Sequence, residues 1–412
     1  LSGKTVGLES VTGSINHITQ TQQWDVDAGR VRLSGTVVGI TSSITATDGL
    51  VMRAGQDINI TGASVSAGNG LGMVAGNDIN IASNEIATSE SRSGRGVTAT
   101  GTSSTTNQGS SITAGGDAVM QAGNNLTVSA SAIDAGKTAQ LVAGNDLNLN
   151  AAGNGQTSRT GGSESHQSSV DRTTISAGDN VTLVAGRDVT SQAAGIAAEG
   201  SVGIQAGRDI NLLAEATTTG SSSHSSKKTV IDESVRQQGT EIASGGNTTM
   251  IAGRDVNTEA AQVTASGDIG VAAGRDVNLI TATESDYHYK EQTKTKKGFL
   301  SSKKTHTIEE DSATREAGTL LSGDNVSVQA GNNLLVKGSS VAGDNTVALG
   351  AGNNVDIVAA TNTDSSWRFK EEKKSGLMGS GGIGFTIGSS QSTHDLREAG
   401  TTQSQSFSTI GS

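Results

Sequence analysis

Apolar and polar residues alternate in short groups along most of the chain. Groups such as Asp57-Ile58-Asn59-Ile60 and Val181-Thr182-Leu183-Val184 place every second side chain on the same face. Alternation with a period of two is typical of a β-strand that buries one face. Because the groups are short and glycines separate them, the pattern predicts many short strands rather than helices.

A seven-residue motif recurs through the chain, for example "VAGNDIN" at 74–80 and "VAGNDLN" at 142–148. Within five doublets, successive Ala-Gly pairs are 21 residues apart, and the distance between doublets is longer and variable. A weaker signature, small-Gly-x-x-apolar-x-apolar, precedes the pairs, so each unit holds two or three short strands. The ten pairs begin at Ala54, Ala75, Ala122, Ala143, Ala185, Ala206, Ala252, Ala273, Ala330 and Ala351.

A unit this short cannot bury its own apolar face, so its copies must stack. If each unit is one turn of a coil, strands of successive turns pair in parallel about 4.7–4.9 Å apart. The inward Val, Ile, Leu and Ala side chains then form continuous ladders. We therefore predict an all-β fold, a right-handed parallel β-helix (β-solenoid) of about 21-residue coils, with the usual hand of parallel crossovers. Ten coils would form a rod about 50 Å long, and up to about 80 Å if other segments add coils.

The glycine of each Ala-Gly pair is predicted to be a structural turn that needs either a positive φ or a close backbone approach. The Asp or Asn two residues later is expected to bond its own backbone in an Asx-type turn or to stack in a ladder. A calcium ladder is the alternative, although the glycine-rich nonapeptide of secreted calcium rolls is not present. Four arginines beside the column are expected to offset the repulsion between stacked aspartates: Arg187, Arg208, Arg254 and Arg275. The ten predicted turn glycines are Gly55, Gly76, Gly123, Gly144, Gly186, Gly207, Gly253, Gly274, Gly331 and Gly352.

The predicted organisation has three parts. Residues 1–50 are expected to form less regular β-helical coils, 51–358 to form paired coils with projecting excursions, and 359–412 to form a terminal excursion or hairpin. The excursions inside the second part are polar and rich in Ser, Thr and Gly. They lie at about 85–112, 152–175, 214–243 and 281–319.

The excursion at 281–319 predicts a long β-hairpin that projects sideways from the rod. Its alternation puts His288 and Lys290 on one face and Tyr287 and Tyr289 on the other. A turn around Gly298 places Lys290 near Glu309 as a cross-strand ion pair. The same folding back makes His288 and His306 possible cross-strand neighbours.

Aromatic and basic residues gather in the last two excursions, which suits contact with an anionic membrane or an envelope polysaccharide. A solvated decoration of the rod is the alternative interpretation. The candidate contact residues are Tyr287, Tyr289, Lys290, Lys294, Lys296, Lys297, Phe299, Trp367 and Phe369.

Composition narrows the function. The chain has 56 Gly, no Pro and no Cys, which excludes disulfides and thiolate metal sites. A net charge of −11 argues against nucleic acid as a partner. No metal-ligand spacing or catalytic triad emerges among the six histidines, so we predict no catalytic residue, metal or cofactor. A polysaccharide-active β-helix enzyme, which needs paired carboxylates on neighbouring coils, is the remote alternative.

The tandem "AGNDINI/AGRDVNL" coils, interrupted by excursions of the "SSKKT" and "KKGFLSSKKTHT" type, resemble haemagglutinin repeats. They are similar to the second repeat class of two-partner-secretion exoproteins, which include filamentous haemagglutinin adhesins and, more closely, contact-dependent growth inhibition effectors. The resemblance covers roughly residues 50–400. Because the chain begins Leu-Ser-Gly, without an initiator Met or a leader, we expect a piece of a longer protein.

The resemblance implies a secreted protein at the bacterial cell surface. Such proteins leave the cell through an outer-membrane transporter, which recognises an N-terminal secretion domain that is missing here. In the growth-inhibition effectors, this region is associated with the target cell's outer membrane, through its lipopolysaccharide or proteins, and with delivery of a C-terminal toxin. The alternative role is a passive filament or adhesin stalk.

Overall fold

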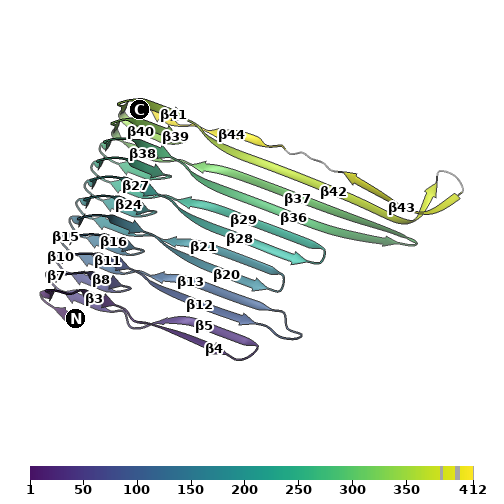
Figure 1. Ribbon diagram of the computed structural model, residues 1–412, viewed down its shortest axis with the longest axis horizontal. Helices are drawn as coiled ribbons and strands as arrows, with labels where there is room; N and C mark the ends of the chain where they lie inside the picture. The colour runs from purple at the N-terminus through teal and green to yellow at the C-terminus, as the bar shows by residue number, and fades with distance from the viewer. Residues whose placement is uncertain (381–383, 395–399, 412) are drawn as a thin grey trace.

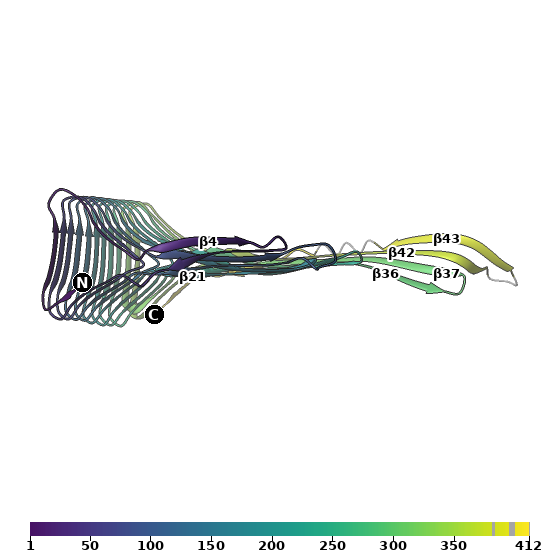
Figure 2. The same ribbon diagram turned by 90° about the horizontal axis from the view of Figure 1, so that it is seen from below.

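The computed structural model describes residues 1–380, 384–394 and 400–411, and every helix or strand assigned in this part is a β-strand. Figure 1 shows a stack of short coils from which long strands project to one side. Figure 2, turned by 90°, shows that the projecting strands form one thin layer. The predicted all-β parallel β-helix with projecting hairpins is confirmed.

Each coil contains three strands, and each strand pairs in parallel with its counterpart in the next coil. One coil is β9 (Ser64–Ala67), β10 (Leu71–Ala75) and β11 (Ile79–Ala82). Ala75 pairs with Ala54 on one side and with Ala122 on the other, and all ten Ala-Gly alanines continue this column. The third column contains 11 strands, so the stack is about 50 Å long.

The strands of the coils form three columns. The first column is β1 (Ser2–Gly3), β6 (Ser43–Ala46), β9, β14 (Ser111–Ala114), β17 (Ala132–Ala135), β22 (Thr174–Ala177), β25 (Gly195–Ala198), β30 (Glu241–Ser244), β33 (Gln262–Ala265), the starts of β38 (Leu320–Ala330) and β40 (Ser340–Ala351), and β45 (Thr409–Gly411). The second is β2 (Val6–Ser10), β7 (Leu50–Ala54), β10, β15 (Ala118–Ala122), β18 (Ala139–Ala143), β23 (Val181–Ala185), β26 (Val202–Ala206), β31 (Thr248–Ala252), β34 (Ile269–Ala273) and the ends of β38 and β40. The third is β3 (Ile15–Ile18), β8 (Ile58–Thr61), β11, β16 (Leu126–Ser129), β19 (Leu147–Asn150), β24 (Val189–Gln192), β27 (Ile210–Leu213), β32 (Val256–Glu259), β35 (Val277–Ile280), β39 (Asn333–Lys337) and β41 (Asn354–Val358).

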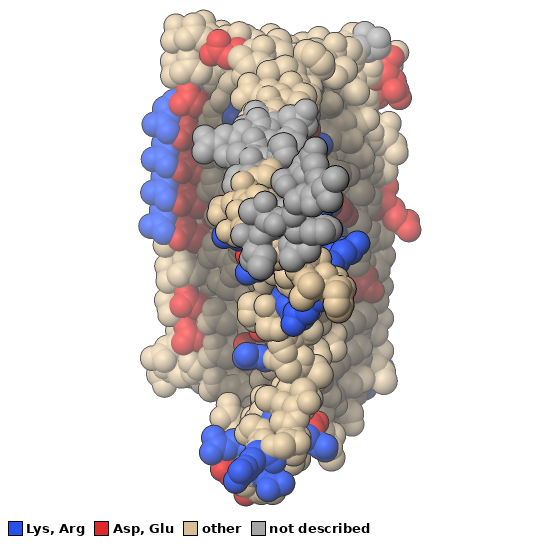
Figure 3. Space-filling model, turned by 90° about the vertical axis from the view of Figure 1, so that its right-hand side faces the viewer, with Lys and Arg blue, Asp and Glu red and all other residues tan. Residues whose placement is uncertain are grey.

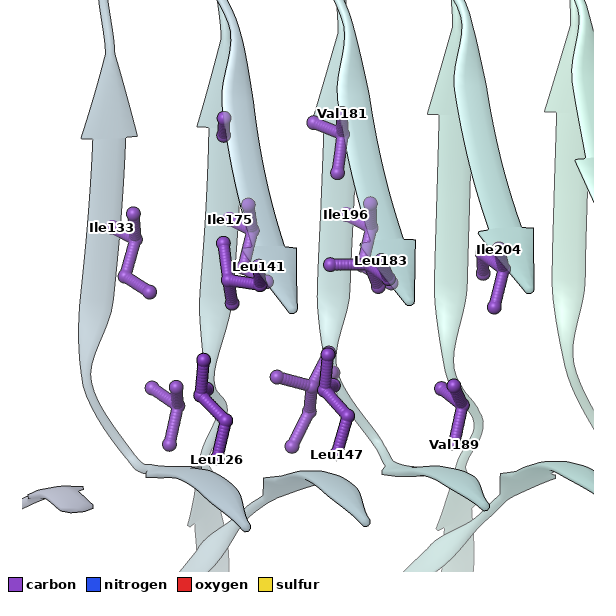
Figure 4. Packing of buried hydrophobic residues seen from close by; sticks show 14 of the residues in the cluster. Leu126, Ile133, Leu141, Leu147, Ile175, Val181, Leu183, Val189, Ile196 and Ile204 are labelled. Atoms are coloured by element: carbon purple, nitrogen blue, oxygen red, sulfur yellow. The ribbon is translucent and has the colours of Figure 1, made fainter. Parts of the chain in front are cut away.

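The core consists of aliphatic ladders that run along the stack. Leu141 pairs with Leu183, which pairs with Ile204, and each of the three is at most 2% exposed. Figure 4 shows these side chains pointing into the narrow space between the strand columns. Because each coil encloses only a few side chains, branched aliphatic residues and methionine fill the space without aromatic rings.

The ten turn glycines lie one above another in a column. Glycine is required there because successive backbones come close together, and not because of a positive φ. A Cβ on Gly76 would lie 2.3 Å from the carbonyl oxygen of Gly55, and one on Gly186 would lie 2.1 Å from that of Gly144. None of the ten has a positive φ. Of the two reasons predicted for these glycines, the structure therefore supports the close backbone approach.

The aspartate column forms a ladder between coils, so the predicted bond of each side chain to its own backbone is wrong. Asp188 Oδ1 accepts the backbone N–H of Asp209 at 3.2 Å, and Asp209 Oδ1 accepts that of Asp255 at 3.2 Å. Stacking brings the N–H of the next coil within reach of each carboxylate. Arg208 donates its Nε–H to Asp188 Oδ1 at 2.7 Å and its Nη2–H to the other oxygen. Figure 3 shows the resulting columns of basic and acidic residues along one edge of the stack.

Acid should destabilise this ladder. The guanidinium groups of Arg208 and Arg275 lower the pKa of Asp188 and Asp255 below the ordinary value of 3.8. Their stabilising contribution is complete above that ordinary value and is lost as the pH falls through the folded-state pKa. The double variant Arg208→Gln and Arg275→Gln should therefore lose less stability between pH 7 and pH 3 than the parent, as measured by urea unfolding.

Arg53 supplies the control for this prediction. It lies on the exposed face of β7 and makes no ion pair with the described residues. Arg53→Gln should keep the parent's dependence on pH. An unchanged dependence in the double variant would show that the ladder contributes nothing to acid sensitivity.

Hairpins emerge from alternate coils, always at the corner between the third and first columns. The intervening coils close this corner with a single residue in the left-handed conformation: Gly62, Ala130, Ala193, Ala260 and Gly338, with φ of 56°, 44°, 50°, 48° and 53°. The hairpin strands form one antiparallel sheet in the order β4-β5-β12-β13-β20-β21-β28-β29-β36-β37-β42-β43. A hairpin of two strands is about 9.6 Å wide, which equals the rise of two coils. This match explains why the motif occurs in doublets.

The hairpin sheet is built from strands of unequal length. They are β4 (Thr21–Asp27), β5 (Val31–Val38), β12 (Asn84–Arg92), β13 (Thr100–Gln108), β20 (Ala152–Thr160), β21 (Ser163–Asp171), β28 (Glu215–Ser225), β29 (Lys228–Gln238), β36 (Ala282–Gly298), β37 (Ser301–Ala317), β42 (Ala360–Ser380), β43 (Gly384–His394) and β44 (Thr402–Ser406), which pairs with β42.

Less regular β-helical coils are the prediction for the N-terminal segment 1–50. It holds one coil, the hairpin β4–β5 and the start of the next coil. The first coil has no Ala-Gly pair. Val11 occupies the position beneath Gly55 where each later coil has a glycine. The four internal excursions contain the hairpins β12–β13, β20–β21, β28–β29 and β36–β37, and 359–412 contains β42–β43 and β44.

A buried hydroxyl closes the base of most hairpins, where the chain returns to the stack. Thr173 is 0% exposed and donates to the carbonyl oxygens of Asn150 at 2.7 Å and Val128 at 3.0 Å. Similarly, Ser110 donates to Ala82 O at 2.7 Å and Thr319 to Ile280 O at 3.0 Å.

Thr173→Val keeps the shape of the side chain and removes the donor. We expect it to lower the free energy of unfolding by about 1–2 kcal/mol. A buried hydrogen bond is lost, but no cavity is created. Thr249→Val, on the exposed face of β31, should change it by less than about 0.5 kcal/mol. Urea unfolding measures both, and equal losses would exclude a special role for the buried hydroxyl.

Candidate functional site

The longest described hairpins carry all nine predicted contact residues. Strands β36 and β37 have 17 residues each, so this hairpin extends about 55 Å from the stack. Its register pairs Lys290 with Glu309 and Gly298 with Ser301, which leaves Phe299 and Leu300 in the turn. The predicted ion pair and turn are confirmed: Lys290 Nζ lies 2.8 Å from Glu309 Oε2.

The sheet separates the predicted contact residues onto two faces, as the alternation indicated. Tyr289 lies opposite Glu310, which lies opposite Trp367, so these three side chains share one face. Lys290 and Glu309 lie on the other face. We name the first the aromatic face and the second the charged face. The predicted contact residues therefore do not form one cluster.

The aromatic face carries a half-buried cluster midway along the hairpin. Trp367 and Phe369 stack with ring centroids 6.2 Å apart, and the edge of His306 meets Phe369 at 5.6 Å. Tyr287 donates to Glu310 at 3.3 Å and Tyr289 to Glu291 at 3.2 Å. Burial, followed by the charge of the neighbouring glutamate, raises the pKa of both tyrosines. These contacts give the four aromatic residues a role in packing on this face.

The charged face is a row of ion pairs that link neighbouring hairpins. Arg236 donates to Asp286 at 2.8 Å, Arg315 to Asp364 at 2.7 Å and Arg368 to Asp311 at 2.8 Å. His288 pairs with Asp232 and lies opposite Asp311, five residues away from His306 along β37, so the predicted histidine neighbours do not meet. The ammonium group of Lys290 lowers the pKa of Glu309.

The far end of the hairpin is basic and apolar. Phe299 is 95% exposed and Leu300 is 61% exposed. Among the described residues, Lys294, Lys296 and Lys297 make no ion pair. Of the nine predicted contact residues, only these three lysines and Phe299 thus remain free at the tip.

The structure adds residues that were not among the predicted contacts. Leu300 adopts a φ of 61° and projects beside Phe299. Neighbouring strands bring Lys303, Lys304, Lys373 and Lys374 to the same end. The basic runs in the sequence could have indicated these lysines, but their approach depends on the pairing of two separate hairpins.

The part of the chain that the structure describes offers neither a candidate metal site nor a candidate membrane-spanning helix. No group of three or more His, Cys, Asp or Glu there could hold a metal ion. The same residues include no helix long and apolar enough to cross a membrane. The side chain of His394, one of the six histidines, lies outside the described residues.

The sequence matches the family model of the hemagglutinin repeat in five overlapping segments, 34–101, 93–165, 155–232, 220–299 and 297–412. It is 64% identical over its full length to the 16S rRNA endonuclease CdiA of Enterobacter cloacae. It is 52% identical to a tRNA nuclease CdiA of Escherichia coli STEC_O31 and 47% identical to the toxin CdiA of Escherichia coli, again over its full length. The chain spans only 10–11% of these three proteins. No solved structure matches it.

Proposed function

The chain belongs to the hemagglutinin-repeat family, and we propose that it is the segment of a secreted bacterial surface exoprotein that associates with a target cell's outer membrane. In this proposal the longer protein carries a toxin at its C-terminal end and kills competing cells on contact. The relatives support this, since their names describe toxins and nucleases, and the repeat segment is about a tenth of each. An outer-membrane transporter would export the longer protein through a domain outside this chain.

One observation carries the proposal: two exposed apolar side chains lie beside lysines at the end of the β36–β37 hairpin, far from the stack. Phe299 and Leu300 are large apolar side chains that face water, which is costly unless a partner covers them. Beside them lie lysines that make no ion pair with any described residue, in a chain whose net charge is −11. Apolar side chains ringed by lysines suit the interface of an anionic membrane.

A matched pair of variants tests this proposal. Phe299→Ser with Leu300→Ser removes the apolar tip and leaves every lysine in place. We expect it to weaken binding to vesicles made from outer-membrane lipids by about tenfold or more, as measured by co-sedimentation. Val51→Ser with Val74→Ser removes two exposed valines from the stack and should leave binding unchanged.

The alternative role, a passive filament or adhesin stalk, gives a different result. A stalk needs only the stiff stack, so the parent chain would not bind the vesicles, or both double variants would bind as the parent does. Either outcome would contradict the membrane role.

A further inference from the structure

Three lysines from three neighbouring strands face one another at the tip of the charged face. Lys296 lies directly opposite Lys303, which lies directly opposite Lys374. Directly opposed side chains in an antiparallel sheet are about 4.5–5.5 Å apart at Cβ, and like charges at this distance are destabilising. An arrangement that costs stability without serving the fold indicates a ligand that compensates it.

A hollow of about 330 Å³ adjoins this row, and its lining includes all three lysines together with Lys297 and Ser301. The next row toward the tip is Gly298, Ser301 and Gly376, so the only side chain in that row is a serine hydroxymethyl group. A Cβ on Gly298 would lie 2.8 Å from Ser301 Oγ, which places that hydroxyl at the edge of the hollow. Ammonium groups, a hydroxyl and bare backbone are groups that bind phosphate.

The hollow retains positive charge. Lys303 Nζ lies 2.9 Å from Glu372 Oε1, and Lys370 shares the same carboxylate at 3.2 Å. Lys296 and Lys374 have no carboxylate partner among the described residues. One glutamate, divided between two lysines, therefore leaves the three-lysine row with an excess of cations.

We propose that this hollow binds the phosphomonoester headgroup of a lipid in the target membrane. The inference rests on the membrane role proposed above and deepens it, because it names the group that the tip recognises. A phosphomonoester carries up to two negative charges and three acceptor oxygens. Three ammonium groups on one side can meet those oxygens together, whereas a headgroup with a single charge gains from only one or two. Phe299 and Leu300, in the adjoining turn, would enter the apolar region as the headgroup is held.

The sheet itself offers a matched control. Lys304 and Lys373 lie at the same tip on the aromatic face and do not line the hollow, whereas Lys297 does. They match Lys303 and Lys374 of the row, because each pair of lysines contains one that pairs with a glutamate: Lys303 with Glu372 and Lys373 with Glu371. Changing either pair to serine removes the same charge at nearly the same distance from the stack. Non-specific attraction therefore predicts equal losses, and the hollow predicts unequal ones.

The first experiment measures binding to phosphatidylcholine vesicles that contain phosphatidic acid. Lys303→Ser with Lys374→Ser should weaken binding at least about tenfold more than Lys304→Ser with Lys373→Ser. Glu372→Gln, which frees Lys303, should tighten binding. Equal losses from the two double variants, or no gain from Glu372→Gln, would overturn the proposal.

A second measurement separates this proposal from the membrane role. Inorganic pyrophosphate, added to the parent chain in solution, should shift the NMR signals of the Lys296, Lys303 and Lys374 ammonium groups and leave those of Lys304 and Lys373 unchanged. If these shifts occur but vesicles do not bind, the phosphate hollow stands and the membrane role fails. If vesicles bind but pyrophosphate shifts neither set, the membrane role stands and the hollow is rejected.

Discussion

Gly186→Ala is expected to break the stack at its middle coils and to lower the free energy of unfolding by more than about 4 kcal/mol. The new methyl group would lie 2.1 Å from the carbonyl oxygen of Gly144, which is closer than any Cβ can approach an oxygen. The two coils would have to separate. The hydrogen bond from the backbone N–H of Gly186 to the carbonyl oxygen of Ala143, which is 3.0 Å long, would lengthen or break. Because the coils pair only with their neighbours, the damage would spread to both sides.

Gly203→Ala is the control for this substitution. Gly203 lies in β26 of the adjacent coil, and a Cβ there would meet nothing within 4 Å. Replacing it should raise the free energy of unfolding by less than about 1 kcal/mol, because alanine lowers the conformational entropy of the unfolded chain. Urea unfolding followed by circular dichroism measures both variants. Similar losses in the two would show that the corner column does not depend on contact between glycines.

Deleting a single plain coil should be more disruptive than deleting three times as many residues. Removal of residues 130–150 takes out a 21-residue coil that carries no hairpin. The hairpins β12–β13 and β20–β21 would then emerge from successive coils, about 4.8 Å apart, although each needs about 9.6 Å. One of them must leave the sheet, so the six residue pairs between β13 and β20 are lost. We expect this loss to lower the free energy of unfolding by about 1–6 kcal/mol in all.

Removal of residues 130–192 provides the comparison. It takes out two coils and one complete hairpin, and it joins Ser129 to Ala193, which occupies the same left-handed corner as Ala130. The remaining hairpins keep their spacing, so β13 can pair with β28. Limited proteolysis should cut the hairpins of the shorter deletion rapidly and those of the longer deletion at the parent's rate. Equal resistance in both would contradict the match between hairpin width and coil rise.

The sequence was sufficient to predict the stack because its information is local and repeated. The 21-residue spacing aligns the two Ala-Gly pairs of each doublet, and the register of Lys290 with Glu309 follows from the turn at Gly298. The period of two coils for each hairpin was visible in the sequence, but its cause was not. That cause is the match between two distances in the folded chain. The width of a two-stranded hairpin in the hairpin sheet equals the rise of two coils.

The candidate site was less predictable, because it combines separate excursions. Tyr287 and Trp367 were grouped with the lysines on composition, but alternation and strand pairing place them in a packed cluster on the opposite face. Lys374 enters the hollow beside Lys296 because β37 pairs with β42 across 14 residue pairs. No spacing in the sequence specifies that register, since the two hairpins are separated by two coils.

The proposed membrane role requires that the hairpin tip, and not the stack, meets the membrane. Because the chain has no cysteine, single cysteines can be introduced at Phe299 on the tip or at Val74 on the stack and labelled with an environment-sensitive fluorophore. With outer-membrane lipid vesicles that carry a quencher in the acyl region, the label at 299 should shift to the blue and be quenched, and the label at 74 should do neither. Equal quenching at both positions, or quenching at 74 alone, would contradict the account.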